Sequence, residues 1–221
     1  MSAGAPRIES FFLPGPAGRL ECLLKHPPDE RPDASAAVVC HPHPLFGGTL
    51  HNKVTHAAAE AIVHAGLPVL RFNFRGAGAS GGRHDHGLGE QEDLVAVLDH
   101  LAGRFPERPL LVAGYSFGAF VGLRVGCRDP RVAALIGIGA PVAMYDFGFL
   151  RSCSKPLTLI QGTEDPFGPL PLLMTLASTL PGGARVVPID GAAHSFGAQL
   201  EALARRVLEA IPAALRSAPV G

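Results

Sequence analysis

The chain of 221 residues is 47% hydrophobic and 17% charged, and its 19 Lys and Arg residues equal its 19 Asp and Glu residues in number. This neutral balance argues against a nucleic-acid partner, because binding a polyanion needs an excess of basic side chains. The length predicts a single domain over residues 1–221. No apolar run reaches the ~18 residues of a membrane span, and the N-terminus lacks the apolar stretch of a secretory signal. We therefore expect a cytoplasmic protein without a membrane partner.

Short apolar segments alternate with helix-like segments along the chain, which predicts an α/β protein built on a mostly parallel sheet. The first two strands, residues 11–13 and 20–24, should pair as a hairpin that turns at residues 14–18. Further strands are expected at residues 36–40, 69–73, 110–113, 134–138, 157–161 and 185–189. Helices, marked by apolar residues that recur at i, i+3 and i+4, are expected at residues 52–64, 90–102, 117–126, 170–180 and 196–211. The sheet should thus hold about eight strands and carry helices on both faces.

Ser116 lies in the motif Gly114-Tyr115-Ser116-Phe117-Gly118, between an expected strand and an expected helix. A Gly-x-Ser-x-Gly motif on a sharp strand-to-helix turn is the setting of a catalytic serine nucleophile. The two glycines let strand and helix pack closely around a turn where the serine takes an unfavourable backbone conformation. With 27 glycines in the chain the motif also arises by chance, and the alternative is a plain glycine-rich turn. The flanking strand and helix favour the nucleophile.

A serine hydroxyl needs a base that takes its proton as it attacks a carbonyl group. His194 follows the last expected strand, where a loop can place its imidazole over Ser116. An imidazole can accept that proton and later give it to the leaving group. The alternative for His194 is a surface or helix-capping histidine, and its position after the last strand favours the base.

Two further motifs accompany the serine motif. They are Cys40-His41-Pro42-His43-Pro44-Leu45-Phe46-Gly47-Gly48 and Arg71-Phe72-Asn73-Phe74-Arg75-Gly76. Over residues 11–211 the chain resembles the α/β-hydrolase superfamily, in particular its small, lidless bacterial branch, which is similar in layout to dienelactone hydrolases. The resemblance implies the α/β-hydrolase fold. Related enzymes often insert a lid between the strands expected at residues 134–138 and 157–161, and the short connection here predicts no large lid.

The resemblance also implies an acid after the penultimate strand, which orients the histidine by accepting its Nδ1 proton. Asp165 fits, because the spacing from Gly162 to Asp165 matches the superfamily's Gly-x-x-Asp pattern. Glu164 is its neighbour and Asp190 lies nearer to His194 in the sequence, so both remain alternatives. Adjacent residues leaving a strand point in different directions, so only one of Glu164 and Asp165 can face the histidine. The other role open to Asp165 is that of a loop-turn residue.

The tetrahedral intermediate of such a reaction carries negative charge on oxygen, which backbone N–H groups stabilise. One donor should be the N–H of Phe117, at the N-terminus of the helix after the nucleophile. The second should come from the loop His41-Pro42-His43-Pro44-Leu45, whose prolines have no N–H. That leaves His43 or Leu45, and the alignment of His41 with the superfamily's usual loop histidine favours His43.

Two other features are of the kind that bind cofactors. His41 and His43, with His84 and His86, are metal-ligand types, but the prolines indicate loop shaping and no spacing places a third ligand. The stretch Gly76-x-Gly78-x-x-Gly81 lacks the Gly-Lys-Ser/Thr of a nucleotide-binding loop. We expect neither a metal nor a cofactor.

These observations predict a serine hydrolase that cleaves a carboxylic ester or thioester of a small acyl substrate through an acyl-enzyme on Ser116. Alternatives are an acyltransferase, a perhydrolase or a peptidase that uses the same residues, and a non-catalytic scaffold that binds a small ligand or a partner protein in the same pocket. We expect a monomer or a small homo-oligomer. Seven residues could build an apolar acyl pocket, and for the aromatic ones ordinary core packing is an equal alternative. They are Phe46, Phe117, Met144, Tyr145, Phe147, Phe149 and Phe167.

Overall fold

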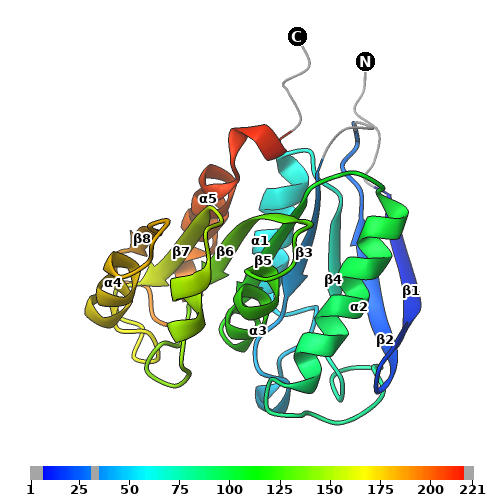
Figure 1. Ribbon diagram of the computed structural model, residues 1–221, viewed down its shortest axis with the longest axis horizontal. Helices are drawn as coiled ribbons and strands as arrows, with labels where there is room; N and C mark the ends of the chain where they lie inside the picture. The colour runs from blue at the N-terminus through cyan, green and yellow to red at the C-terminus, as the bar shows by residue number, and fades with distance from the viewer. Residues whose placement is uncertain (1–6, 31–34, 217–221) are drawn as a thin grey trace.

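The computed structural model describes residues 7–30 and 35–216. Eight strands form one sheet: β1 (Ile8–Gly15), β2 (Gly18–Lys25), β3 (Ala36–Cys40), β4 (Val69–Phe72), β5 (Leu110–Tyr115), β6 (Val132–Ile138), β7 (Leu157–Gly162) and β8 (Arg185–Ile189). Their order is β1-β2-β4-β3-β5-β6-β7-β8 (Figure 1). Strands β3 to β8 run parallel to one another, and β2 is antiparallel to both of its neighbours. The expected mostly parallel sheet of about eight strands is confirmed.

The hairpin of β1 and β2 has a tighter turn than the sequence predicts. Only Pro16 and Ala17 form the turn, because strand pairing continues as far as Gly15 and Gly18. Gly18 has a φ of 127°, which residues with a side chain rarely adopt. Pro14 lies within β1, an edge strand, where a missing N–H is tolerated. The expected turn over residues 14–18 was therefore too wide.

Helices cover both faces of the sheet (Figure 1). One face carries α1 (Lys53–His64) and α5 (Leu200–Ala210), and the other carries α2 (Gly89–Arg104), α3 (Phe117–Gly126) and α4 (Leu170–Ser178). The helix expected over residues 196–211 begins later, because Phe196 has a φ of 54° and is followed by a short 3-10 turn, η3 (Gly197–Gln199). The ring of Phe196 is fully buried, so packing of the ring accompanies this departure from the helical pattern.

The sheet separates two apolar layers. In β3, Ala36, Val38 and Cys40 pack in the layer with α2 and α3, whereas Ala37 and Val39 pack in the layer with α1 and α5. Every residue of β3 is buried, as is typical of a parallel strand covered on both faces. The sheet is therefore a rigid support for the loops that leave its carboxyl ends.

The carboxyl ends of β5, β7 and β8 meet at one edge of the sheet because the three strands are parallel. Ser116 follows β5, Asp165 follows β7 and His194 follows β8. Residues 139–156, between β6 and β7, form turns and the short η2 (Gly148–Ser152) rather than a lid. In the described ranges, no helix has the length and apolar character needed to cross a membrane.

Candidate active site

Ser116 occupies a sharp turn between β5 and α3. Its φ of 56° and ψ of −120° are unfavourable for a residue with a side chain. Backbone hydrogen bonds hold this conformation, since the N–H of Ser116 donates to the carbonyl of Ile138 and its carbonyl accepts from Ala119, both at 2.9 Å. A side chain at Gly114 would collide with the carbonyl oxygen of Gly118, so the first glycine of the motif is required for the close approach of strand and helix.

Three side chains from separate loops form one hydrogen-bonded row. The Nε2 atom of His194 lies 2.9 Å from the hydroxyl oxygen of Ser116, and its Nδ1 atom lies 2.7 Å from Oδ2 of Asp165. A carboxylate only accepts, so Nδ1 carries the ring proton and Nε2 is free to accept from the serine hydroxyl. The structure thus brings together the predicted nucleophile, base and acid in the geometry that activates a serine.

Asp165 faces the imidazole, whereas the other two candidate acids do not. Glu164 and Asp190 are exposed, and neither carboxylate bonds to His194 within the described chain. The side chain of Asp165 is fully buried. The N–H of Glu164 donates to the carbonyl of Ala192 at 3.0 Å, and this bond ties the loop after β7 to the loop after β8.

Asp165 receives two further hydrogen bonds. The N–H of Phe167 donates to Oδ1 at 2.9 Å, and the Nε2 of Gln161 donates to Oδ2 at 2.7 Å. Gln161 was not among the residues predicted from the sequence. Its only signal is a glutamine near the end of the mostly apolar strand β7, which contains no charged residue.

Tyr115 supports the loop that carries the base. Its hydroxyl donates to the backbone carbonyl of His194 at 3.0 Å, and the two rings lie 5.3 Å apart. Burial, with a smaller contribution from the Asp165 charge, raises the pKa of Tyr115 to about 12. The hydroxyl therefore stays protonated and able to donate across the neutral pH range.

The N-terminus of α3 meets the loop after β3. Phe117 is the first residue of α3, so no earlier turn of that helix supplies an acceptor for its N–H. Gly118 lies so close to this loop that a Cβ there would be 2.5 Å from the carbonyl oxygen of His41. The ring of His43 packs against that of Phe117 with a centroid distance of 4.9 Å. Both expected oxyanion donors therefore belong to segments beside Ser116.

Two histidines shape this loop in different ways. His41 is fully buried, its Nε2 accepts from the N–H of Phe74 at 2.9 Å, and its Nδ1 lies 2.6 Å from the carbonyl of Pro42. Burial lowers the pKa of His41 to about 4, so the ring is neutral at pH 7. The Nδ1 of His43 accepts from the N–H of Leu45 at 3.2 Å. The N–H of Leu45 is therefore already engaged, which favours His43 over Leu45 as the oxyanion donor.

Comparison with known proteins shows the family of this chain. The family model described as serine aminopeptidase, S33, matches residues 33–155, more than half of the chain. The chain belongs to this family of α/β serine hydrolases. The expected superfamily membership is confirmed.

Two solved structures and one sequence relative are similar to this hydrolase over most of its length. An α/β serine hydrolase homologue from Coxiella burnetii is 35% identical, with a TM-score of 0.85, 92% of this chain and 97% of the other covered. A Xanthomonas campestris protein, described as an α/β serine hydrolase without lid, is 33% identical, with a TM-score of 0.90 and 99% and 100% coverage. An uncharacterized protein of Rickettsia prowazekii is 35% identical over 209 residues, which are 90% of this chain and 87% of the relative.

A cavity of about 350 Å³ opens beside Ser116 in this hydrolase. Among the described residues that line it, none is Asp, Glu, Lys or Arg. Five of the seven predicted pocket residues line the cavity: Phe46, Phe117, Met144, Tyr145 and Phe167. The prediction was wrong for Phe147, which is buried in the core, and for Phe149, which stacks on Phe147 at 5.7 Å. Both rings pack around Phe120, away from the nucleophile.

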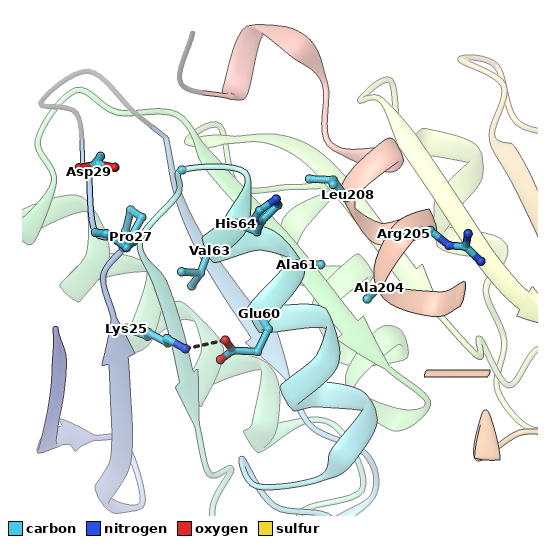
Figure 2. A pocket seen from close by; sticks show the side chains of 12 residues that line it. Lys25, Pro27, Asp29, Glu60, Ala61, Val63, His64, Ala204, Arg205 and Leu208 are labelled. Atoms are coloured by element: carbon cyan, nitrogen blue, oxygen red, sulfur yellow. Dashed lines mark hydrogen bonds and ion pairs between the residues drawn. The ribbon is translucent and has the colours of Figure 1, made fainter. Parts of the chain in front are cut away.

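A larger hollow of about 850 Å³ lies elsewhere, between the end of β2, α1 and α5 (Figure 2). Lys25 and Glu60 form an ion pair in its wall at 2.5 Å, and His64 and Arg205 also line it. None of its described lining residues is a serine, threonine or cysteine. Ser116 and His194 line the smaller cavity and not this hollow.

His43, His84 and His86 form a cluster of rings beside the cavity. The ring centroids of His43 and His84 are 4.6 Å apart, and those of His84 and His86 are 5.1 Å apart. Glu90 is buried, and its carboxylate accepts from the N–H groups of Asp85 and Gly87 at 2.9 and 2.8 Å. In the part of the chain that the structure describes, no three His, Cys, Asp or Glu side chains are placed to hold a metal ion.

Proposed function

We propose that this hydrolase cleaves carboxylic esters or thioesters of small, uncharged acyl groups through an acyl-enzyme on Ser116. The observation that carries the proposal is the row from Ser116 Oγ through His194 to Asp165, with distances of 2.9 and 2.7 Å. A protein that only binds a ligand has no use for a nucleophile, a base and a buried acid aligned in this way.

In the acylation step, His194 takes the proton of Ser116 as Oγ attacks the carbonyl carbon of the substrate. The negative charge that forms on the carbonyl oxygen is stabilised by the N–H groups of Phe117 and His43. His194 then gives its proton to the leaving alcohol or thiol, and the acyl group stays on Ser116. Asp165 stabilises the imidazolium that exists between these transfers.

In the deacylation step, water takes the place of the alcohol. His194 removes a proton from the water, the hydroxide oxygen attacks the acyl carbon, and the proton returns to Ser116 as the acid leaves. The cavity is open to solvent because Phe46, Met144 and Phe167 at its rim are 83%, 57% and 41% exposed. Water can therefore reach the acyl-enzyme without displacement of a lid.

The lining of the cavity favours an ester or thioester over an aminopeptidase substrate. An aminopeptidase has to recognise the ammonium group at the start of a peptide, and a carboxylate is the usual partner for such a charge. The cavity walls contain no Asp or Glu among the described residues, and they are largely aromatic and aliphatic. An uncharged acyl group fits these walls without leaving a charge unpaired.

The test is hydrolysis of p-nitrophenyl acetate and butyrate, and of a short-chain acyl thioester, by wild type and Ser116→Ala. We expect turnover by wild type and a loss of about 10⁴-fold or more in the variant. Ser195→Ala is the matched control, because Ser195 is exposed and next to the base, whereas the hydroxyl that bonds to His194 belongs to Ser116.

A fluorophosphonate probe followed by intact mass measurement supplies the second readout. One adduct on wild type and Ser195→Ala, and none on Ser116→Ala, would support the proposal. Turnover by Ser116→Ala at the wild-type rate would contradict it. Ligand binding by a wild-type protein that neither reacts with the probe nor hydrolyses any substrate would favour the scaffold.

A further inference from the structure

Gln161 donates a hydrogen bond to the carboxylate of Asp165, the acid that contacts His194. It lies at the end of β7, and its side chain is completely buried. Its Nε2 donates to Oδ2 of Asp165 at 2.7 Å, and the same oxygen accepts from Nδ1 of His194 at 2.7 Å. One carboxylate oxygen is thus shared between a fixed amide and the catalytic imidazole.

The buried carboxylate of Asp165 has few other partners. Its Oδ1 accepts from the N–H of Phe167 at 2.9 Å. No Lys or Arg in the described ranges bonds to it, so its negative charge is held by neutral donors alone until His194 becomes protonated. A buried carboxylate without such donors would favour its protonated form. Gln161 is the side chain that supplies one of them.

Packing alone does not explain why residue 161 is a glutamine rather than an apolar residue. Its Oε1 is buried and has no hydrogen-bond partner in the described structure, which is an unfavourable state for an amide oxygen. Rotating the amide would place Oε1 against the carboxylate, so the orientation follows from the hydrogen-bond network. Gly168 makes room for the amide, because a Cβ at that position would collide with Nε2 of Gln161. An apolar side chain of similar length would fill the slot without an unpaired oxygen.

We infer that Gln161 is a positioning residue that fixes Asp165 and limits how strongly Asp165 holds the imidazolium of His194. The inference rests on the proposed function, because it assigns Gln161 a role in the same row. A hydrogen bond from Gln161 disperses the carboxylate charge. Without that bond, Asp165 attracts the protonated imidazole more strongly, and His194 remains protonated, and unable to act as a base, up to a higher pH.

The test compares wild type with Gln161→Met, which keeps the length of the side chain and removes the donor. We expect kcat/KM for p-nitrophenyl acetate to fall, and the acid limb of its pH profile to move upward by about one pH unit, as for a lost hydrogen bond to a charged group. Gln199→Met is the matched control, since the side chain of Gln199 bonds in the described ranges only to the Gly191 carbonyl, at 3.4 Å, and its profile should equal that of wild type.

Gln161→Glu is the second variant, and it tests the donor itself. The introduced carboxyl can donate to Asp165 only while it is protonated, and the neighbouring carboxylate favours that form. We expect this variant to approach wild-type activity at low pH and to lose activity as pH rises, in contrast to Gln161→Met. It also carries the test if Gln161→Met does not fold.

An NMR titration of the His194 imidazole, assigned by its absence in His194→Gln, separates this inference from the proposed function. An upward shift of the titration midpoint in Gln161→Met supports the inference even if wild type hydrolyses no ester. An active wild type with an unchanged midpoint and an unchanged acid limb in folded Gln161→Met would overturn it. A loss of thermal stability in Gln161→Met with neither shift would show a purely structural role and would also overturn it.

Discussion

Replacing Gly118 by alanine should disable the oxyanion site while leaving the protein folded. The added methyl group would lie 2.4 Å from the carbonyl oxygen of Cys40, at the end of β3, and 2.5 Å from that of His41, whereas ordinary contact begins near 3.4 Å. The loop after β3 and the start of α3 must therefore separate by about 1 Å. A displacement of this size near reacting groups costs about 100-fold in rate. We expect kcat/KM of Gly118→Ala to fall by about that factor, because the N–H groups of Phe117 and His43 lie on the two segments that separate.

The variant should also lose stability, because the added methyl group meets backbone carbonyl oxygens rather than the end of a flexible side chain. Crowding in a packed region costs about 1–3 kcal/mol, and Ala in place of Gly within a helix returns about 1 kcal/mol. The free energy of unfolding should thus fall by no more than about 2 kcal/mol, which leaves the chain folded at room temperature.

Gly122→Ala is the control, one turn further along the same helix. A Cβ at Gly122 would lie 3.2 Å from Cγ1 of Val112, a contact that a shift of a few tenths of an ångström would relieve. We expect kcat/KM within about two-fold of wild type in this variant, with a slight gain in stability. The assays are p-nitrophenyl acetate hydrolysis, the rate of fluorophosphonate labelling and chemical denaturation. A folded Gly118→Ala with wild-type kcat/KM, or an equal loss in Gly122→Ala, would refute the reasoning.

Three further predictions concern single side chains. Burial lowers the pKa of His41 from 6.5 to about 4, so between these pH values the unfolded chain binds a proton that the folded chain does not, and the free energy of unfolding falls as pH drops. His41→Gln lacks this group, so between pH 6.5 and 4 its free energy of unfolding in denaturant titrations should fall by about 3 kcal/mol less than that of wild type. His43→Asn keeps an acceptor for the N–H of Leu45 and should retain more activity than His43→Phe, which keeps a ring but no acceptor; equal activities would argue against the loop bond. Asp165→Asn should lower kcat by about 10⁴-fold because the amide favours the wrong tautomer of His194, and circular dichroism should show an unchanged fold.

Much of the fold is predictable because it depends on local patterns. Buried parallel strands such as β3 are short apolar runs, and α3 follows directly from the serine motif. Their order and their common edge then bring Ser116 and His194 together. The same reasoning fails where packing overrides the pattern, as at Phe196, whose buried ring lies in a left-handed turn within an apparently helical segment.

The contacts that tune the site could not be predicted in the same way. Gln161 and Asp165 are four residues apart in the sequence, but their hydrogen bond depends on how the loop after β7 folds back on the strand. The cap from His43 to the N–H of Leu45 depends on a single loop conformation. The aromatic residues near positions 144–149 share one composition, and only the backbone path decides that Tyr145 borders the cavity while Phe147 does not.

The rim of the cavity has a consequence for how this chain can change over evolutionary time. Phe46, Met144 and Phe167 come from three different loops, and each is exposed to solvent and belongs to neither apolar layer. Surface side chains of this kind can be exchanged with little effect on folding. The shape of the cavity mouth can therefore diversify independently of the sheet, so that one scaffold can present different openings to its substrates.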